Sequence, residues 1–269
     1  MTDIASHLPQ RTLELRNLAN VKPSQTTWLS EGRVPFGALT VIAGRPGEGK
    51  SQLTIALAAR LSLDSPAVLI GAEDDEAHTI VPRLIAQGAN RENVLTPKVS
   101  NEWGRPDAPS FPVDIERLGR EVKESGAMLV VVDPFAAHLD PDLNAFNDHS
   151  LRQATRPLAA MARETGAAVV IVSHLRKSRE GGAMDWIGGS GGLVGSARSV
   201  FIFGRSKKDD AWDEDRRYLL NVKNNLAKLA APMRFRVETR LVDFGGRMIE
   251  TSRVVSEEED RSVKVEDIE

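Results

Sequence analysis

Cysteine is absent from this sequence of 269 residues. Without cysteine the chain has neither disulfide bonds nor thiolate metal ligands, which fits a reducing cytoplasm. The five histidines are scattered, and no two of them have the spacing of a metal-binding pair. The composition therefore gives no support for a zinc site or a related metal centre.

Long hydrophobic runs are also missing. No stretch of about 18 consecutive apolar residues occurs, and the opening residues MTDIASHLPQ lack the basic start and apolar core of a signal peptide. We therefore expect a cytoplasmic protein that has no membrane partner.

Neither charge sign is in strong excess, because 35 basic side chains face 38 acidic ones, a formal net charge of −3. This balance disfavours a general nucleic-acid-binding protein. Residues 256–269, however, carry seven acidic and two basic side chains, a net charge of −5, which leaves about +2 for the rest of the chain. We expect residues 253–269 to form an acidic, disordered tail. Residues 1–25 are predicted to be an N-terminal arm, either disordered or packed on a neighbouring subunit.

Short apolar runs rich in β-branched residues alternate with helix-like stretches along the chain. The runs predict strands over residues 38–44, 67–72, 93–99, 127–133, 167–174 and 199–203. The stretches between them predict helices over residues 50–62, 75–87, 113–125 and 150–165. This alternation predicts an α/β fold, a mostly parallel sheet with helices on both faces, in one domain over residues 26–252. After residue 215 the pattern predicts antiparallel strands added at one sheet edge, with a turn at Gly245 and Gly246.

Residues 44–51 read GRPGEGKS, which matches the phosphate-loop pattern G-x-x-x-x-G-K-[ST] in full. The motif follows a predicted strand and precedes a predicted helix, which is the context it requires. Its glycines let backbone N–H groups wrap phosphates, its lysine reaches the β and γ oxygens, and its serine binds Mg²⁺. The helix N-terminus adds positive charge. The nucleotide-binding residues predicted here are Gly44, Pro46, Gly47, Glu48, Gly49, Lys50, Ser51 and Gln52.

Two further acids follow predicted strands. Asp133 ends the strand in MLVVVDP and is predicted to support Mg²⁺; on its own such an aspartate would cap a helix or a turn. Glu73 follows the strand in LIGAEDDEA and is predicted to activate water, although acids here also suit a helix N-terminus. Because parallel strands end at one crevice, we expect both carboxylates to lie near the phosphate loop.

These segments resemble the RecA-like core of hexameric replicative helicases, most closely the plasmid helicases of the RepA type, within the RecA and DnaB group of P-loop ATPases. The resemblance covers about residues 28–225 and rests on WLSEGRVPFGALTVIAGRPGEGKSQLTIALA, GAEDDEAHTIVPRL, VVVDP, VIVSH and GGSGGLVGSAR. It implies ATP and Mg²⁺ as cofactors and a homo-oligomer, six subunits in this family, that acts on single-stranded DNA.

The resemblance also implies roles for individual residues. Lys50, Ser51 and Asp133 match the phosphate and Mg²⁺ site, and Glu73 matches the residue that activates water. His174 matches a sensor of the γ-phosphate, with a core histidine as the alternative. The remaining matches are Arg83, which would lie against the adenine, and Arg198, which would enter the neighbouring subunit's ATP site. For Arg198 the alternative is a surface helix arginine.

The sequence departs from this family at two places. DnaB-like relatives carry Lys-x-Arg near the C-terminus, and here NVKNNLAK keeps Lys223 but has Asn225 at the arginine position. The positive charge supplied to the neighbouring subunit's ATP site would therefore come from Arg198 alone or from Arg198 together with Lys223. No collar, primase or zinc module is recognisable, so a primase or initiator protein would be a separate partner.

Residues 173–198 contain seven glycines and a basic cluster. In the family such a loop faces the centre of the ring. We expect Arg176, Lys177 and Arg179 to bind DNA phosphates and Trp186 to stack on a base, while the glycines allow movement. A flexible linker is the alternative for the segment, and a packing anchor is the alternative for Trp186.

The sequence thus predicts an ATPase that works as a ring-shaped helicase or translocase on single-stranded DNA, in the replication of a plasmid, phage or mobile element. One alternative is a RecA-like recombinase or strand-annealing ATPase. A second is a regulatory or defence-associated ATPase that acts on a protein partner. The phosphate site alone does not separate the three.

Overall fold

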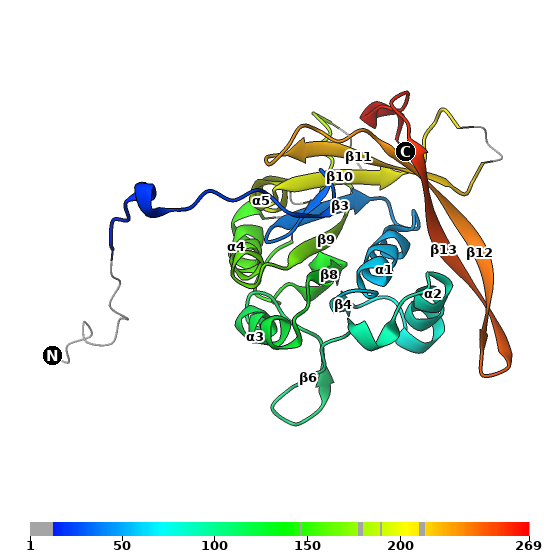
Figure 1. Cartoon of the computed structure of the whole chain (residues 1–269), viewed down its shortest axis with the longest axis horizontal. Helices are drawn as coiled ribbons and strands as arrows, with labels where there is room; N and C mark the ends of the chain where they lie inside the picture. The colour runs from blue at the N-terminus through cyan, green and yellow to red at the C-terminus, as the bar shows by residue number, and fades with distance from the viewer. Residues whose placement is uncertain (1–12, 146, 177–179, 189, 210–212, 269) are drawn as a thin grey trace.

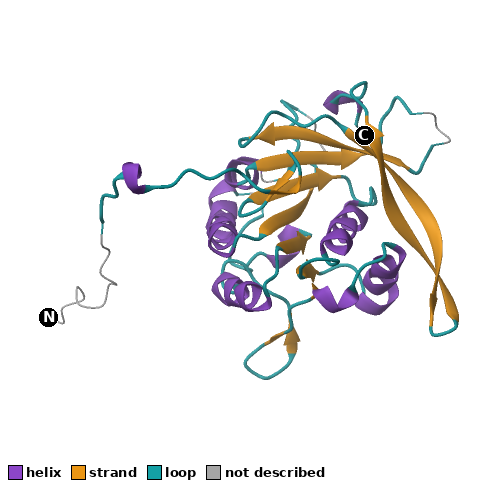
Figure 2. Ribbon diagram, viewed as in Figure 1, coloured by secondary structure: helices purple, strands orange, loops and turns teal. Residues whose placement is uncertain are grey.

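The computed structural model describes residues 13–145, 147–176, 180–188, 190–209 and 213–268. Its centre is a nine-stranded sheet with the strand order β13-β12-β11-β10-β3-β9-β8-β4-β5 (Figures 1 and 2). These strands are β3 (Leu39–Gly44), β4 (Ala67–Gly71), β5 (Val94–Leu95), β8 (Leu129–Asp133), β9 (Ala168–His174), β10 (Ser199–Gly204), β11 (Arg216–Asn224), β12 (Met233–Phe244) and β13 (Arg247–Glu259). Two small ribbons lie apart from it: β1 (Trp28–Ser30) with β2 (Val34–Pro35), and β6 (Val99–Ser100) with β7 (Pro106–Asp107).

The sheet has a parallel part and an antiparallel part. Neighbouring strands from β10 through β3, β9, β8 and β4 to β5 run parallel. Strand β11 pairs antiparallel with β10, and β12 and β13 continue this pattern outward as a long hairpin. The hairpin turn is at Gly245 and Gly246, both with positive φ. The predicted fold class, including the antiparallel strands at the C-terminal edge, is therefore confirmed.

Helices cover both faces of the parallel strands. The helices are α1 (Lys50–Leu61), α2 (Val81–Ala86, preceded by a π-helical turn at Glu76–Ile80), α3 (Ile115–Ser125), α4 (Asp148–Thr165) and α5 (Ser190–Ser196). One hydrophobic cluster joins the sheet to α3, α4 and α5. A second cluster, on the opposite face, joins it to α1, α2 and the β12–β13 hairpin. Strand β3 serves both, because Val41 belongs to the first cluster and Ile42 to the second.

The predicted strand over residues 93–99 is wrong in extent. Only Val94–Leu95 joins the main sheet, and Val99–Ser100 pairs with β7 in a separate ribbon. Pro97 stands between the two pieces. A proline has no backbone N–H to donate to a sheet, so the continuous strand is interrupted there.

The predicted disorder of residues 253–269 is also wrong for most of that segment. Strand β13 runs to Glu259, and a 3-10 helix forms at Val265–Asp267. Val263 and Ile268 are buried in a third cluster with Trp186, Ile202 and Tyr218. The acidic composition did not indicate that two buried apolar side chains anchor this segment.

The described part of the N-terminal arm, which starts at residue 13, runs away from the body in Figure 1. Within its described part, Leu13, Leu15 and Leu18 are exposed, and one short 3-10 helix forms at Leu18–Asn20. The boundaries predicted for the arm and for the domain over residues 26–252 stay predictions. In the part of the chain that the structure describes, no helix is both long and apolar enough to span a bilayer.

Candidate nucleotide site

The phosphate loop connects the end of β3 to the first turn of α1. Two glycines are required by geometry. A Cβ at Gly44 would lie 2.2 Å from the carbonyl oxygen of Phe203, and Gly49 caps α1 with φ of 91°. The loop therefore takes its shape from close backbone packing against β10 and from a left-handed residue before the helix.

Lys50 begins α1 and is only 5% exposed. Its Nζ donates a hydrogen bond to the carbonyl oxygen of Arg45, at 2.7 Å. Burial lowers the pKa of Lys50, while the nearby carboxylates of Asp133, Glu48 and Glu73 raise it. The ammonium group is thus held inside the loop, close to where phosphate oxygens are expected.

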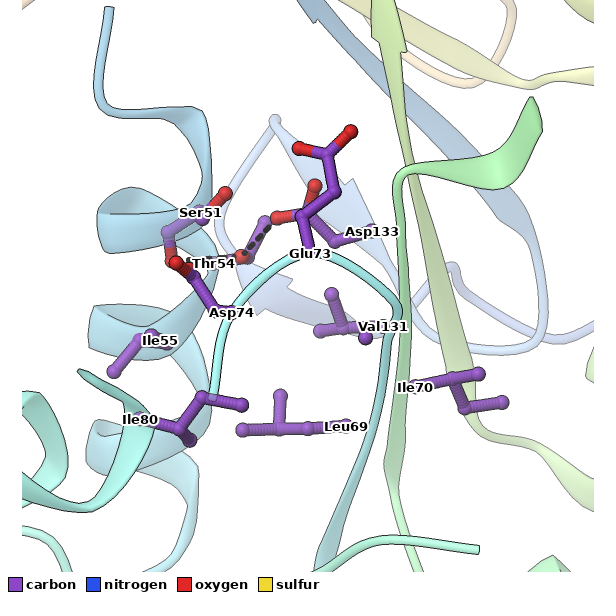
Figure 3. A pocket seen from close by; sticks show the side chains of 11 residues that line it. Ser51, Thr54, Ile55, Leu69, Ile70, Glu73, Asp74, Ile80, Val131 and Asp133 are labelled. Carbon is purple, nitrogen blue, oxygen red and sulfur yellow. Dashed lines mark hydrogen bonds between the residues drawn. The ribbon is translucent and has the colours of Figure 1, made fainter. Parts of the chain in front are cut away.

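Asp133 ends β8 beside α1, as Figure 3 shows. The Ser51 side chain donates a hydrogen bond to its carboxylate, and the Thr54 hydroxyl lies 3.4 Å from its Oδ2. Burial raises the pKa of Asp133 to about 6, although the Ser51 hydrogen bond and Lys50 act in the opposite direction. Thr54 was not identified from the sequence. Its position one helical turn after Ser51 is the signal that would have indicated it.

Glu73 follows β4 and lines the same small pocket as Ser51 and Asp133 (Figure 3). Its side chain is exposed, and its charge acts on Lys50, Asp133 and His174. The crevice expected from the strand ends is therefore present, since residues after β3, β4 and β8 meet there.

The donor set suits Mg²⁺, because a hydroxyl and carboxylates are the hard oxygen ligands that this ion takes. In the described ranges no group of three or more His, Cys, Asp or Glu side chains is arranged as a metal site. Mg²⁺ at a nucleotide site takes one or two protein ligands together with phosphate oxygens.

His174 ends β9 and pairs in register with Gly44. Burial lowers the pKa of His174, and Lys50 lowers it further, whereas Glu73 and a backbone hydrogen bond to Gly44 raise it; the net lowering favours the neutral imidazole. A neutral ring beside the phosphate loop fits the predicted sensor position. Gln52 lies in the first turn of α1, next to Gly49.

Arg83, the residue predicted to lie against the adenine, is in α2. Arg83 pairs with Asp74, with 2.8 Å between Nη1 and Oδ2, and this ion pair ties α2 to the loop after β4. The role of Arg83 at the base stays a prediction.

Arg198 and Lys223 lie at the other end of the sheet. The backbone N–H of Arg198 donates to the carbonyl oxygen of Leu39, the first residue of β3, whereas the phosphate loop follows the last, Gly44. Five residues of strand span on the order of 17 Å, so Arg198 does not reach the phosphate loop of its own subunit. Its side chain is exposed. Lys223 instead donates to the carbonyl oxygens of Val194 and Ala197 at the end of α5.

The base-stacking role proposed for Trp186 is wrong for this structure. Its side chain is 8% exposed and packs with Tyr218 and Ile268 in the third cluster, so the alternative of a packing anchor applies. Arg176 donates its backbone N–H to the carbonyl oxygen of Trp186. Lys177 and Arg179 lie outside the described residues.

Two arginines that the sequence did not indicate lie beside the loop. Arg205 follows β10 and Arg217 is in β11, and both form ion pairs with the buried carboxylate of Glu48. The Glu48 side chain thus faces the antiparallel strands, and its predicted part in the phosphate cradle stays a prediction.

Comparison with known proteins identifies the family and the fold. The family model described as AAA domain matches residues 5–180. Among solved structures, an ATPase domain superposes with a TM-score of 0.55 at 16% identity, covering 73% of this chain and 80% of that one. This likeness supports the RecA-like fold.

The sequence is also similar to curated proteins named DNA repair protein RadA. The protein from Bacillus subtilis (strain 168) is 27% identical over 148 residues, which is 54% of this chain and 30% of the relative. The one from Chlamydia pneumoniae is 24% identical over 174 residues, 63% of this chain and 35% of the relative. The chain thus spans about a third of the length of these curated relatives.

Proposed function

Since this chain belongs to the AAA domain family and is an ATPase, we propose that it hydrolyses ATP with Mg²⁺ as the motor of a helicase or translocase on single-stranded DNA. Lys50 and the loop amides bind the phosphates, and Ser51 and Asp133 hold Mg²⁺. Glu73 orients the attacking water, and neutral His174 senses the γ-phosphate. The magnesium ion would neutralise charge on the phosphates.

One observation carries the proposal: the phosphate loop and Arg198 lie at opposite ends of β3. A complete site would then need an arginine from a second subunit, which favours a head-to-tail ring or filament. Such an arginine would neutralise the charge that develops on the transferred phosphoryl group. We propose a ring of six subunits in the cytoplasm, with a primase or initiator as a separate partner.

The first test measures ATP hydrolysis with and without single-stranded DNA. Stimulation by DNA is the expected result, and a rate that no nucleic acid changes would contradict a DNA motor.

The second test mixes Lys50→Ala and Arg198→Ala subunits, each of which should be inactive alone. About a quarter of the interfaces in the mixture would pair an intact loop with an intact arginine and recover activity. A mixture that stays inactive would contradict action in trans.

A recombinase or annealing ATPase is the second candidate, favoured by the similarity to proteins named for DNA repair. Electron micrographs and a strand-displacement assay separate the two. Closed rings and displaced strands support the helicase, whereas helical filaments and pairing without displacement support the recombinase.

A further inference from the structure

Glu48 places a carboxylate inside the phosphate loop, where bound polyphosphate would be repelled. Its side chain is 6% exposed and faces the start of β11, where Arg217 lies. Arg217 Nε lies 3.1 Å from its Oε2, and an Nη of Arg205 lies 3.2 Å from its Oε1. Two arginines thus face this one carboxylate, and the charges of Glu214 and Asp215 also act on Arg217.

Arg217 also holds the backbone of the loop. The same Nε donates a hydrogen bond to the carbonyl oxygen of Glu48, at 2.9 Å, and the arginine is 8% exposed. This carbonyl shares a trans peptide with the N–H of Gly49, and the two groups of a trans peptide point in opposite directions. A carbonyl held toward β11 therefore turns the Gly49 N–H away from β11.

We propose that Glu48 and Arg217 are positioning residues of the nucleotide site, which orient the Gly49 N–H toward the phosphates shared by ADP and ATP. The carboxylate fixes the guanidinium, and the guanidinium fixes the peptide. Arg205 is half-exposed and forms a second ion pair with Glu48. This inference rests on the proposed nucleotide role of the loop.

Charge repulsion and positioning predict opposite effects of removing Glu48 on nucleotide affinity. If Glu48 acted only through its charge, its removal would strengthen nucleotide binding, and ATP would gain more than ADP because it carries more charge. If Glu48 positions the loop, its removal weakens the binding of both nucleotides by the same factor, because the amides in question contact phosphates that both contain.

The experiment uses Glu48→Gln and Arg217→Gln, with Arg216→Gln as the matched control. Arg216 is the neighbouring residue of β11 and pairs with Asp209 and Asp213, not with Glu48. Binding of fluorescent ADP and ATP is measured together with kcat and KM. We expect both test variants to bind each nucleotide on the order of tenfold more weakly, mainly in KM, and the control to bind like the wild type.

A double variant separates positioning from folding. Replacing Glu48 and Arg217 together by methionine removes both buried charges, which commonly preserves stability. The double variant should unfold at a denaturant concentration near that of the wild type and still bind nucleotide weakly. Unchanged or tighter ATP binding by Glu48→Gln would overturn the inference. Failure of the wild type to bind ATP would instead contradict the proposed function.

Discussion

The phosphate loop and the glycine-rich stretch over residues 173–198 both contain several glycines, yet they fold differently. The loop is short, its glycines have separate steric tasks, and the flanking strand and helix fix its place. Within its described residues, the longer stretch folds back on itself, because the Gly188 N–H donates to the carbonyl oxygen of His174 and Leu175 bridges Ile187. The side chain of Ile187, buried between the glycines, helps to hold this described part against the body.

Loss of the Lys50 ammonium should have the largest effect and would test the phosphate-loop side of the comparison. Lys50→Ala removes the buried cation nearest the expected phosphates, so ATP hydrolysis should fall by about a thousandfold or more. A steady-state phosphate-release assay measures this. Hydrolysis within about tenfold of the wild type would mean that the loop is not the site of reaction.

Truncation of Trp186 tests the glycine-rich stretch, the second region of the comparison. Trp186→Ala should lower the free energy of unfolding by about 3–5 kcal/mol, because a large buried ring is removed from the third cluster. Denaturant unfolding measures the loss. Trp103→Ala is the matched control, since Trp103 is 75% exposed and its removal should change stability by less than about 0.5 kcal/mol. Lower DNA affinity at unchanged stability would restore the base-stacking hypothesis.

The pKa of Asp133 gives a pH test within the phosphate site. Its pKa is about 6 in the folded protein and 3.8 ordinarily, so the folded state binds the proton more tightly between these values. Without Mg²⁺, the stability that the neutral carboxyl contributes is fully present below about pH 4 and is lost as the pH rises through about 6. Relative to Asp133→Asn, the wild type should lose about 2–3 kcal/mol over this interval. A pH-independent difference between the two unfolding curves would contradict this.

The smallest expected effect concerns Lys223 in β11, whose side chain donates hydrogen bonds to the end of the glycine-rich stretch. Lys223→Met keeps the aliphatic stem but removes the hydrogen bonds to the last carbonyls of α5, so stability should fall by about 1 kcal/mol. Unfolding and ATP hydrolysis are measured on the same preparation. A large fall in hydrolysis at unchanged stability would indicate that Lys223 acts on a neighbouring nucleotide instead.

The sequence predicted the parallel strands well, because runs such as LTVIAG in β3 are apolar on both faces and have few alternatives. The grouping of site residues at the ends of these strands could also be predicted, because parallel strands end at one shared crevice. The burial of Trp186 was left open, because it depends on Tyr218 and Ile268, which lie far away in the sequence. The ordered acidic segment was missed for the same reason. Its charged residues indicated a solvated segment, whereas burial of Val263 and Ile268 holds the segment against the body.

The contact between Arg217 and Glu48 joins residues 169 positions apart. A motif that looks local in the sequence is thus completed only when β11 has paired with β10. Contacts of such long separation form late and slowly during folding, because a large loop must close first. During synthesis the chain would therefore reach its full affinity for ATP only after strand β11 has emerged and paired with β10.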